Sequence, residues 1–326
     1  MIDHEQINTL DDAALRSAER RRFLSLVGRS GAAAGGLALL SACGSDSSSS
    51  NPTPTPSASA TASIEAADIT ILKFALQLEY LSGQYFSLAA TGAGLPAADL
   101  TGSGTQGSVT GGALVPFTDP QVAAVAREMA RDDREHVEFL RSLIGTTPTA
   151  QPAINIDAGT GAFATLMQNA GIAGFNPYAS DVNFLLGALI LKDVIATAYK
   201  GLVPLIGTPS FITGAAGVLG AEAYHAGLIR TLLYQKAVAN SSILSTVTAI
   251  STYRDSLDGS TTLDKGIAGA DSTISNIAPV DGNGITYSRT TGQVLNILFL
   301  NKAAVTSGGF FPAGVNGTVN TSAASG

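Results

Sequence analysis

Two short patterns place an acid and a histidine at a spacing that suits metal coordination. They are Asp133-Arg-Glu-His136 and Glu222-Ala-Tyr-His225, each with the carboxylate three residues before the imidazole. Residues i and i+3 lie on one face of an α-helix, so each pair would present both side chains to the same neighbours. Carboxylate oxygens and imidazole nitrogens are common ligands of first-row transition metals. The two patterns therefore predict a metal site between helices.

Chance explains this arrangement poorly. The chain has three histidines and, apart from His4, each has an acid three residues earlier. At the acid content of this chain, chance gives such a coincidence in roughly one sequence of 170. The competing interpretation is a pair of core histidines that form salt bridges with acids on adjacent helices.

Two further acids complete the set of candidate ligands. Glu79 and Asp193 lie on apolar stripes of helical period, where a buried carboxylate needs a partner, a proton or a metal. The six candidate metal ligands are therefore Glu79, Asp133, His136, Asp193, Glu222 and His225. Nearby tyrosines are candidates for hydrogen bonds to these ligands, although core packing is the simpler role for each: Tyr80, Tyr199 and Tyr224.

Four long segments of helical periodicity must position these residues. They cover residues 63–90, 120–144, 181–205 and 209–237. The last two are joined by a few residues, whereas long segments rich in Gly, Ser, Thr or Pro join the others. This pattern predicts an all-α four-helix bundle with one long crossover. Asp193 and Glu222 each lie about 18 Å from the short turn, which places them at one height in the bundle.

The predicted bundle occupies residues 63–258 and includes a fifth, shorter helix that ends at Gly259. Residues 259–326 are expected to be mostly irregular, with the apolar run Val294–Leu300 packing on the bundle. Acids Asp132, Glu135 and Glu138 crowd the second helix off its apolar stripe and are expected to form a solvated face.

At these residues the sequence resembles the ferritin-like superfamily, in particular bacterial ferritin-like-domain proteins related to plant desiccation-related proteins. The resemblance covers roughly residues 64–237, and two tail segments, 288–295 and 308–317, are also similar to that branch. It implies a di-iron or di-manganese site, two metals per chain, with the four acids as carboxylate ligands and both histidines as terminal ligands. Asp133 and Asp193 stand where the family usually has Glu, so a single metal or a looser pair is an alternative.

Composition restricts the partners. The net charge is −7, which disfavours nucleic acid as a partner, and one cysteine excludes a disulfide framework or a multi-cysteine zinc site. Metal ions are the expected partners; a homo-oligomer is compatible with the sequence, but no motif specifies one.

The first 43 residues have the features of an export signal. Arg20-Arg21-Arg22-Phe23-Leu24 resembles a twin-arginine motif, and Leu40-Ser41-Ala42-Cys43 resembles a lipobox in which Cys43 receives lipid. A transmembrane anchor is the alternative, but Arg29 and several glycines interrupt the apolar stretch. Residues 44–62, mostly Ser, Pro, Thr and Ala, are predicted to be a disordered tether. These features predict a periplasmic or cell-surface lipoprotein anchored to the membrane through Cys43.

Two functions fit these expectations. The first is an exported metal-binding redox enzyme, peroxidase-like or ferroxidase-like, acting on O₂, peroxide or Fe(II). The second is a non-catalytic structural protein of desiccation or stress, in which the metal site is vestigial. A surface-interaction module built on the Gly/Ser/Thr tail has no motif in its favour.

Overall fold

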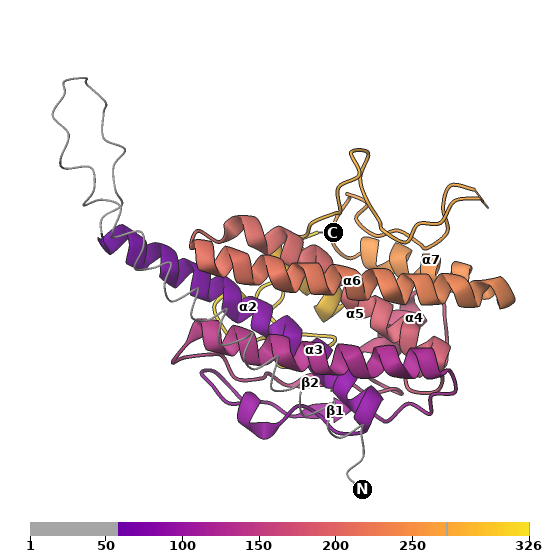
Figure 1. The fold of residues 1–326 in the computed structure, drawn as a ribbon, viewed down its shortest axis with the longest axis horizontal. Coiled ribbons are helices and arrows are strands. Elements are labelled where there is room, and N and C mark those ends of the chain that lie inside the picture. The colour runs from indigo at the N-terminus through magenta and orange to yellow at the C-terminus, as the bar shows by residue number, and fades with distance from the viewer. Residues whose placement is uncertain (1–57, 272, 326) are drawn as a thin grey trace, which may run out of the picture. The chain divides into compact units, whose positions relative to one another are not determined.

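Four long helices lie side by side and form the body of the protein (Figure 1). The structure is a computed structural model that describes residues 58–271 and 273–325, and the part from Ala60 onward forms one compact unit. The bundle helices are α2 (Ala58–Thr91), α3 (Pro120–Ile144), α5 (Asp181–Leu202) and α6 (Pro209–Ala239). The predicted all-α bundle is confirmed.

The first bundle helix begins earlier than the sequence predicted. Residues 58–62 were expected to belong to a disordered tether, yet α2 already includes them. This stretch contains only Ala, Ser and Thr, without Pro or Gly, so nothing in it opposes extension of the helix. The rest of the predicted tether, the predicted signal at 1–43 and Cys43 lie outside the described residues.

Helix starts follow local capping. The Asp119 carboxylate accepts a hydrogen bond from the Gln121 amide at 2.9 Å, and Pro120 occupies the first helical position of α3. The Ser180 hydroxyl accepts from the Asn183 amide in the same way at the start of α5. These caps fix where the two helices begin, which in turn fixes the height of the residues they carry.

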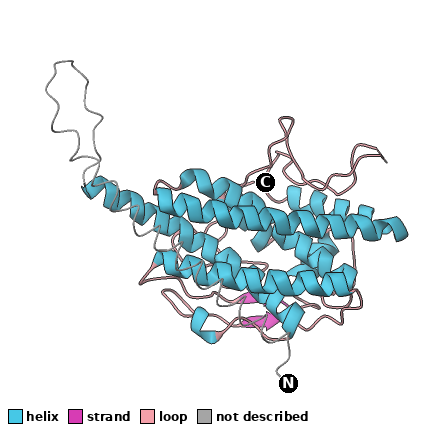
Figure 2. Cartoon of the chain, in the orientation of Figure 1, coloured by secondary structure: helices cyan, strands magenta, loops and turns pink. Residues whose placement is uncertain are grey.

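The two long connections contain more structure than their composition indicated. They hold the short 3₁₀ helix η2 (Ala97–Asp99), helix α4 (Ala162–Asn169) and two strands, β1 (Val109–Gly111) and β2 (Ile154–Ile156). The strands pair in parallel, with Val109 opposite Ile154, and lie beside the bundle (Figure 2). Strands of three residues are too short to produce a recognisable alternating pattern.

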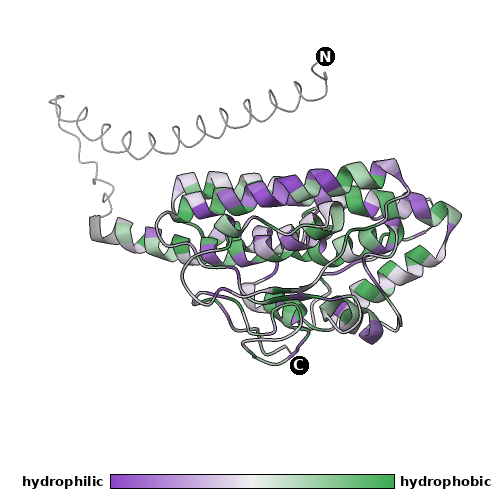
Figure 3. Ribbon diagram, turned by 90° about the horizontal axis from the view of Figure 1, so that it is seen from below, coloured by the Kyte–Doolittle hydropathy of each residue, from purple (hydrophilic) through white to green (hydrophobic). Residues whose placement is uncertain are grey.

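Most residues of helix α5 are buried in the core. Its neighbour in sequence, η3 (Val203–Leu205), joins it to α6 by a short link, as expected. The segment Asp181–Leu205 is long and apolar enough to cross a membrane, but 78% of its most apolar window is buried inside the protein, which suits a core helix. Hydrophilic residues recur between hydrophobic ones along the other helices, as in helices with one face in the core (Figure 3).

The C-terminal part adds two shorter helices. Helix α7 (Ser242–Asp255) is the expected fifth helix, and α8 (Thr291–Phe299) contains most of the apolar run predicted to pack on the bundle. A capping box formed by Thr290 and Gln293 starts α8, whose residues from Val294 to Phe299 are buried and which packs against α5. Irregular chain makes up most of the remainder of residues 259–325.

Candidate metal centre

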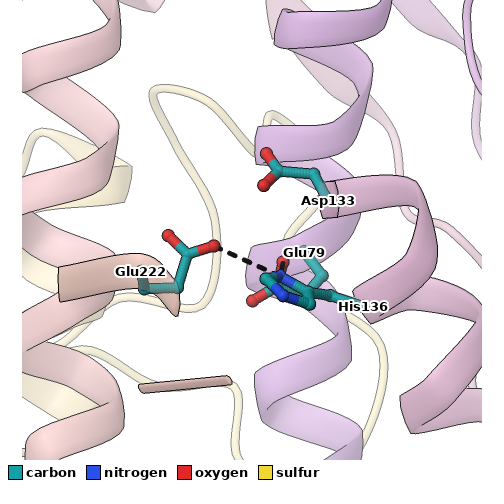
Figure 4. A group of neighbouring side chains, drawn as sticks. All are labelled: Glu79, Asp133, His136 and Glu222. Carbon is teal, nitrogen blue, oxygen red and sulfur yellow. Dashed lines mark ion pairs between the residues drawn. The ribbon is translucent and has the colours of Figure 1, made fainter. Parts of the chain in front are cut away.

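Four of the six predicted ligands meet in the middle of the bundle. They are Glu79 from α2, Asp133 and His136 from α3, and Glu222 from α6, and each contributes a ligand atom within 4.8 Å of the others. Figure 4 shows their side chains converging from three helices. The three acids are fully buried, and only the His136 side chain retains slight exposure, at 12%.

His136 lies between two of the acids. Its Nδ1 atom is 3.3 Å from Glu79 Oε2 and 3.3 Å from Glu222 Oε1, as the dashed lines in Figure 4 mark. Neither Glu79 Oε2 nor His136 Nδ1 has a hydrogen-bond partner, although both atoms are buried. Unpaired buried polar atoms are costly. Two atoms bound to one metal at about 2.0–2.2 Å lie at most about 4.4 Å apart, and His136 Nδ1 lies within that distance of both Glu79 Oε2 and Glu222 Oε1, as a shared metal ion requires.

A lysine that sequence reasoning missed occupies the other side of the group. Lys192 of α5 is fully buried, and its Nζ donates to Asp133 Oδ1 at 2.6 Å. The same ammonium group donates to both carboxylate oxygens of Glu222, each at 2.8 Å. Its three N–H donors therefore have three carboxylate acceptors.

Two hydroxyl groups orient the acids. The Tyr199 hydroxyl donates to Glu79 Oε1 at 2.7 Å, and the Ser82 hydroxyl donates to Asp133 Oδ2 at 2.6 Å. Of the three tyrosines suggested by the sequence, Tyr199 alone contacts the group. Tyr80 instead hydrogen-bonds to backbone carbonyls of Asp99 and Thr149, and Tyr224 is 82% exposed.

His225 borders the group but is directed elsewhere. Its Nε2 lies 3.3 Å from Asp132 Oδ2, and its Nδ1 lies 3.8 Å from Glu222 Oε1 without a hydrogen bond. The His225 ring centroid is 6.4 Å from that of His136. Asp132, expected on a solvated face, is thus the partner of a predicted ligand.

Asp193 does not join the group, contrary to the sequence prediction. Its Oδ2 accepts hydrogen bonds from Arg230 Nη1 at 2.8 Å and from Arg254 Nη2 at 3.1 Å. Because successive residues of a helix differ by about 100° in direction, the interior position of Lys192 turns its neighbour Asp193 toward α6 and α7. The sequence prediction used the distance of Asp193 from the turn, and this distance is nearly the same for its neighbour Lys192.

Charge explains the protonation behaviour of the group. Burial, and then the charge of Glu222, raise the pKa of Glu79. Burial would also raise the pKa of Glu222, but Lys192 and the two histidines hold it well below its ordinary value. Burial would lower the pKa of His136, but Glu222 and Glu79 raise it to about 10. In the metal-free protein, His136 is therefore a cation at neutral pH.

Signals for two of the missed residues were present in the sequence. Lys192 interrupts the apolar run of α5, with Leu189 and Ile195 three residues to either side, so it lies on a buried stripe. Ser82 follows Glu79 by three residues and shares its helix face. A lysine on an apolar stripe, next to an acid, is a reason to ask which of the two faces inward.

A model of the ferritin-like domain matches residues 67–235, more than half of the chain. This protein belongs to the ferritin-like domain family. The ferritin-like catalase Nec2 of Nesocodon mauritianus is 28% identical over 278 residues, which cover 78% of this chain and 86% of that protein. The desiccation-related protein PCC13-62 of Craterostigma plantagineum is 28% identical over 250 residues, 71% of this chain and 77% of that protein. No solved structure gives a significant match. The predicted relationship to desiccation-related proteins is confirmed.

The separation of Asp193 from the four-residue group predicts that this residue stabilises the fold and does not bind the metal. Replacing Asp193 with Asn removes the charge that Arg230 and Arg254 share, and breaking a buried pair of this kind costs about 3 kcal/mol in free energy of unfolding. We expect urea denaturation to show this loss, while the metal content stays that of wild type. Glu128→Gln, on the exposed side of α3, is the matched control and should change neither quantity. Loss of metal with unchanged stability would instead make Asp193 a ligand.

Proposed function

We propose that this ferritin-like protein binds a redox-active divalent metal, iron or manganese, at Glu79, Asp133, His136 and Glu222. The observation that carries the proposal is the convergence of these four residues, with Glu79 Oε2 and His136 Nδ1 buried, 3.3 Å apart and without a hydrogen bond. A histidine that binds a metal must be neutral, and with His136 deprotonated the three ionised carboxylates and one ammonium leave a net charge of −2, which a divalent cation balances. Oxygen and imidazole donors without a thiolate suit iron and manganese.

The residues around the group are arranged to hold it. Tyr199 orients Glu79 so that one carboxylate oxygen is fixed and the other faces His136. Ser82 and Lys192 each hold one carboxylate oxygen of Asp133, and Lys192 also restrains Glu222. Such outer partners raise affinity and fix ligand geometry. A bound iron or manganese ion would supply one-electron redox chemistry, for which O₂, peroxide and Fe(II) are candidate substrates.

Among these substrates, we propose hydrogen peroxide. Support comes from the relative in Nesocodon mauritianus, which is named a ferritin-like catalase and aligns over 86% of its own length. The reaction would be the disproportionation of two H₂O₂ to two H₂O and one O₂. The buried position of the acids favours so small a substrate over a large organic one.

A non-catalytic role in desiccation or stress is the second candidate. The buried Lys192 favours it, because this residue already neutralises part of the acidic charge without any metal. The name of the Craterostigma plantagineum relative points in the same direction. The metal site would then be a remnant, and the bundle would depend on its core for stability.

Metal analysis of the purified full-length protein tests the first candidate. We expect iron or manganese to copurify with the protein from its native host. Loss of a residue that only hydrogen-bonds to a ligand typically lowers the metal affinity about 10–100-fold, and His136→Ala, which removes a ligand, should lower it further. Tyr224→Phe, an exposed change on α6, is the control and should keep the metal. Wild-type protein that is folded, metal-free and unable to take up Mn²⁺ or Fe²⁺ would support the stress role instead.

Oxygen release from hydrogen peroxide tests the substrate. The metal-loaded protein should produce one O₂ for every two H₂O₂ consumed, measured with an oxygen electrode. Tyr199→Phe removes the hydrogen bond to Glu79 and should reduce the rate about 10–100-fold with the metal still bound. Tyr80→Phe, a buried tyrosine that does not contact the group, should keep the wild-type rate. A metal-loaded wild type that leaves peroxide unchanged would rule out this substrate.

We propose in addition that the protein is exported by the twin-arginine route and anchored by lipid at Cys43 in the periplasm or on the cell surface. The support lies in the arginines at 20–22, the apolar stretch that follows and the sequence Leu40-Ser41-Ala42-Cys43. The absence of any other cysteine is consistent with a role for Cys43 as the anchor point.

Metabolic labelling with palmitate tests the anchor. Wild-type protein produced in its native host should incorporate label and sediment with membranes, whereas Cys43→Ser should remain unlabelled because it lacks the thiol that would receive lipid. Ser45→Ala, two residues away, should still be labelled. Unlabelled wild-type protein in the cytoplasm would contradict the proposal.

A further inference from the structure

We infer that the Lys192 ammonium group occupies the position of a second metal, so that the centre holds one metal ion and one fixed internal cation. The inference rests on the proposed metal-binding function and specifies how many metals it involves. The two-metal expectation depended on Asp193 and His225, and neither belongs to the four-residue group.

The contacts of Lys192 are those of a cation held between carboxylates. Its Nζ has Asp133 Oδ1 and both oxygens of Glu222 within 2.6–2.8 Å. Glu222 Oε1 also lies 3.3 Å from His136 Nδ1, so this one oxygen contacts both a proposed metal ligand and the ammonium group. A carboxylate shared between two metals has the same relation to both of them.

Helix geometry leaves no ligand on α5 for a second ion. At this level α2, α3 and α6 each direct a carboxylate inward, whereas α5 directs Lys192 inward and Asp193 away. The Phe86 ring lies 5.0 Å from Lys192 Nζ and covers another side of the ammonium group. Carboxylates and an aromatic ring therefore surround the position in which a second metal would need ligands.

The charges of the buried side chains also indicate one metal ion. In the metal-bound state, with His136 neutral as a ligand, Glu79, Asp133 and Glu222 carry −3 when ionised and Lys192 carries +1. One divalent ion brings the buried group to zero. A second divalent ion would add an excess of +2 next to the ammonium group, where burial leaves little water to screen the repulsion.

The test is a titration of metal-free, full-length protein with Mn²⁺, read by equilibrium dialysis and by electron paramagnetic resonance. Wild type should bind one Mn²⁺ per chain and give the six-line spectrum of an isolated ion. Lys192→Glu replaces the cation by a carboxylate, and should bind two Mn²⁺ with the spectrum of a spin-coupled pair. Lys200→Glu, the same change on a half-buried residue of the same helix, should keep one.

Each outcome decides between the two proposals. A coupled pair in wild type overturns the role of Lys192 and leaves the metal-binding function standing, whereas no binding at all overturns the metal-binding function. If Lys192→Glu does not fold, Lys192→Gln removes the charge and keeps an oxygen donor; it should bind a second Mn²⁺, more weakly. A folded Lys192 variant that still binds one Mn²⁺ contradicts the inference.

Discussion

One buried ammonium group determines how the centre of the bundle is built. Lys192 of α5 bridges Asp133 of α3 and Glu222 of α6, and all three side chains are fully buried. Removing one partner of such a set leaves an uncompensated charge at a cost of about 3–5 kcal/mol. The rotation of α5 about its axis is therefore fixed, because any other rotation would leave the acids without their cation.

That rotation also organises the C-terminal part. With Lys192 inside, Asp193 meets Arg230 and Arg254, and Arg254 continues to Asp264 at 2.6 Å. Asp264 in turn pairs with Arg289, which also pairs with Asp258. Buried positive and negative charges therefore alternate from α5 and α6, through α7, to the segment that precedes α8. A misplaced tail would leave one of these charges unpaired. The alternating charges thus select a single arrangement for a segment whose composition alone predicted little structure.

The limits of sequence reasoning follow from these contacts. Periodicity located the four bundle helices, and the i, i+3 patterns found Asp133, His136 and Glu222, because both signals are local. The choice between Lys192 and Asp193 depends on how α5 is rotated against three other helices, which no local pattern encodes. An acid is a common metal ligand and a lysine is seldom fully buried, so residue type favours Asp193 although Lys192 is the residue that faces inward. The partnership of His225 with Asp132 likewise depends on packing between α3 and α6.

The exposure of the side chains around the group shows where solvent reaches it. The side chains of Glu79, Asp133, Glu222 and Lys192 are closed to solvent, whereas His136 and His225 keep 12% and 8% of their side-chain surface exposed. Solvent therefore meets the centre at the edge formed by His136 of α3 and His225 of α6, whereas the ammonium group is fully buried. A metal at His136 would lie nearest to this edge, with its donors fixed from behind by Tyr199, Ser82 and Lys192. The donors for a metal and the fixed ammonium group thus form two unequal halves of the centre, which suits one metal better than two.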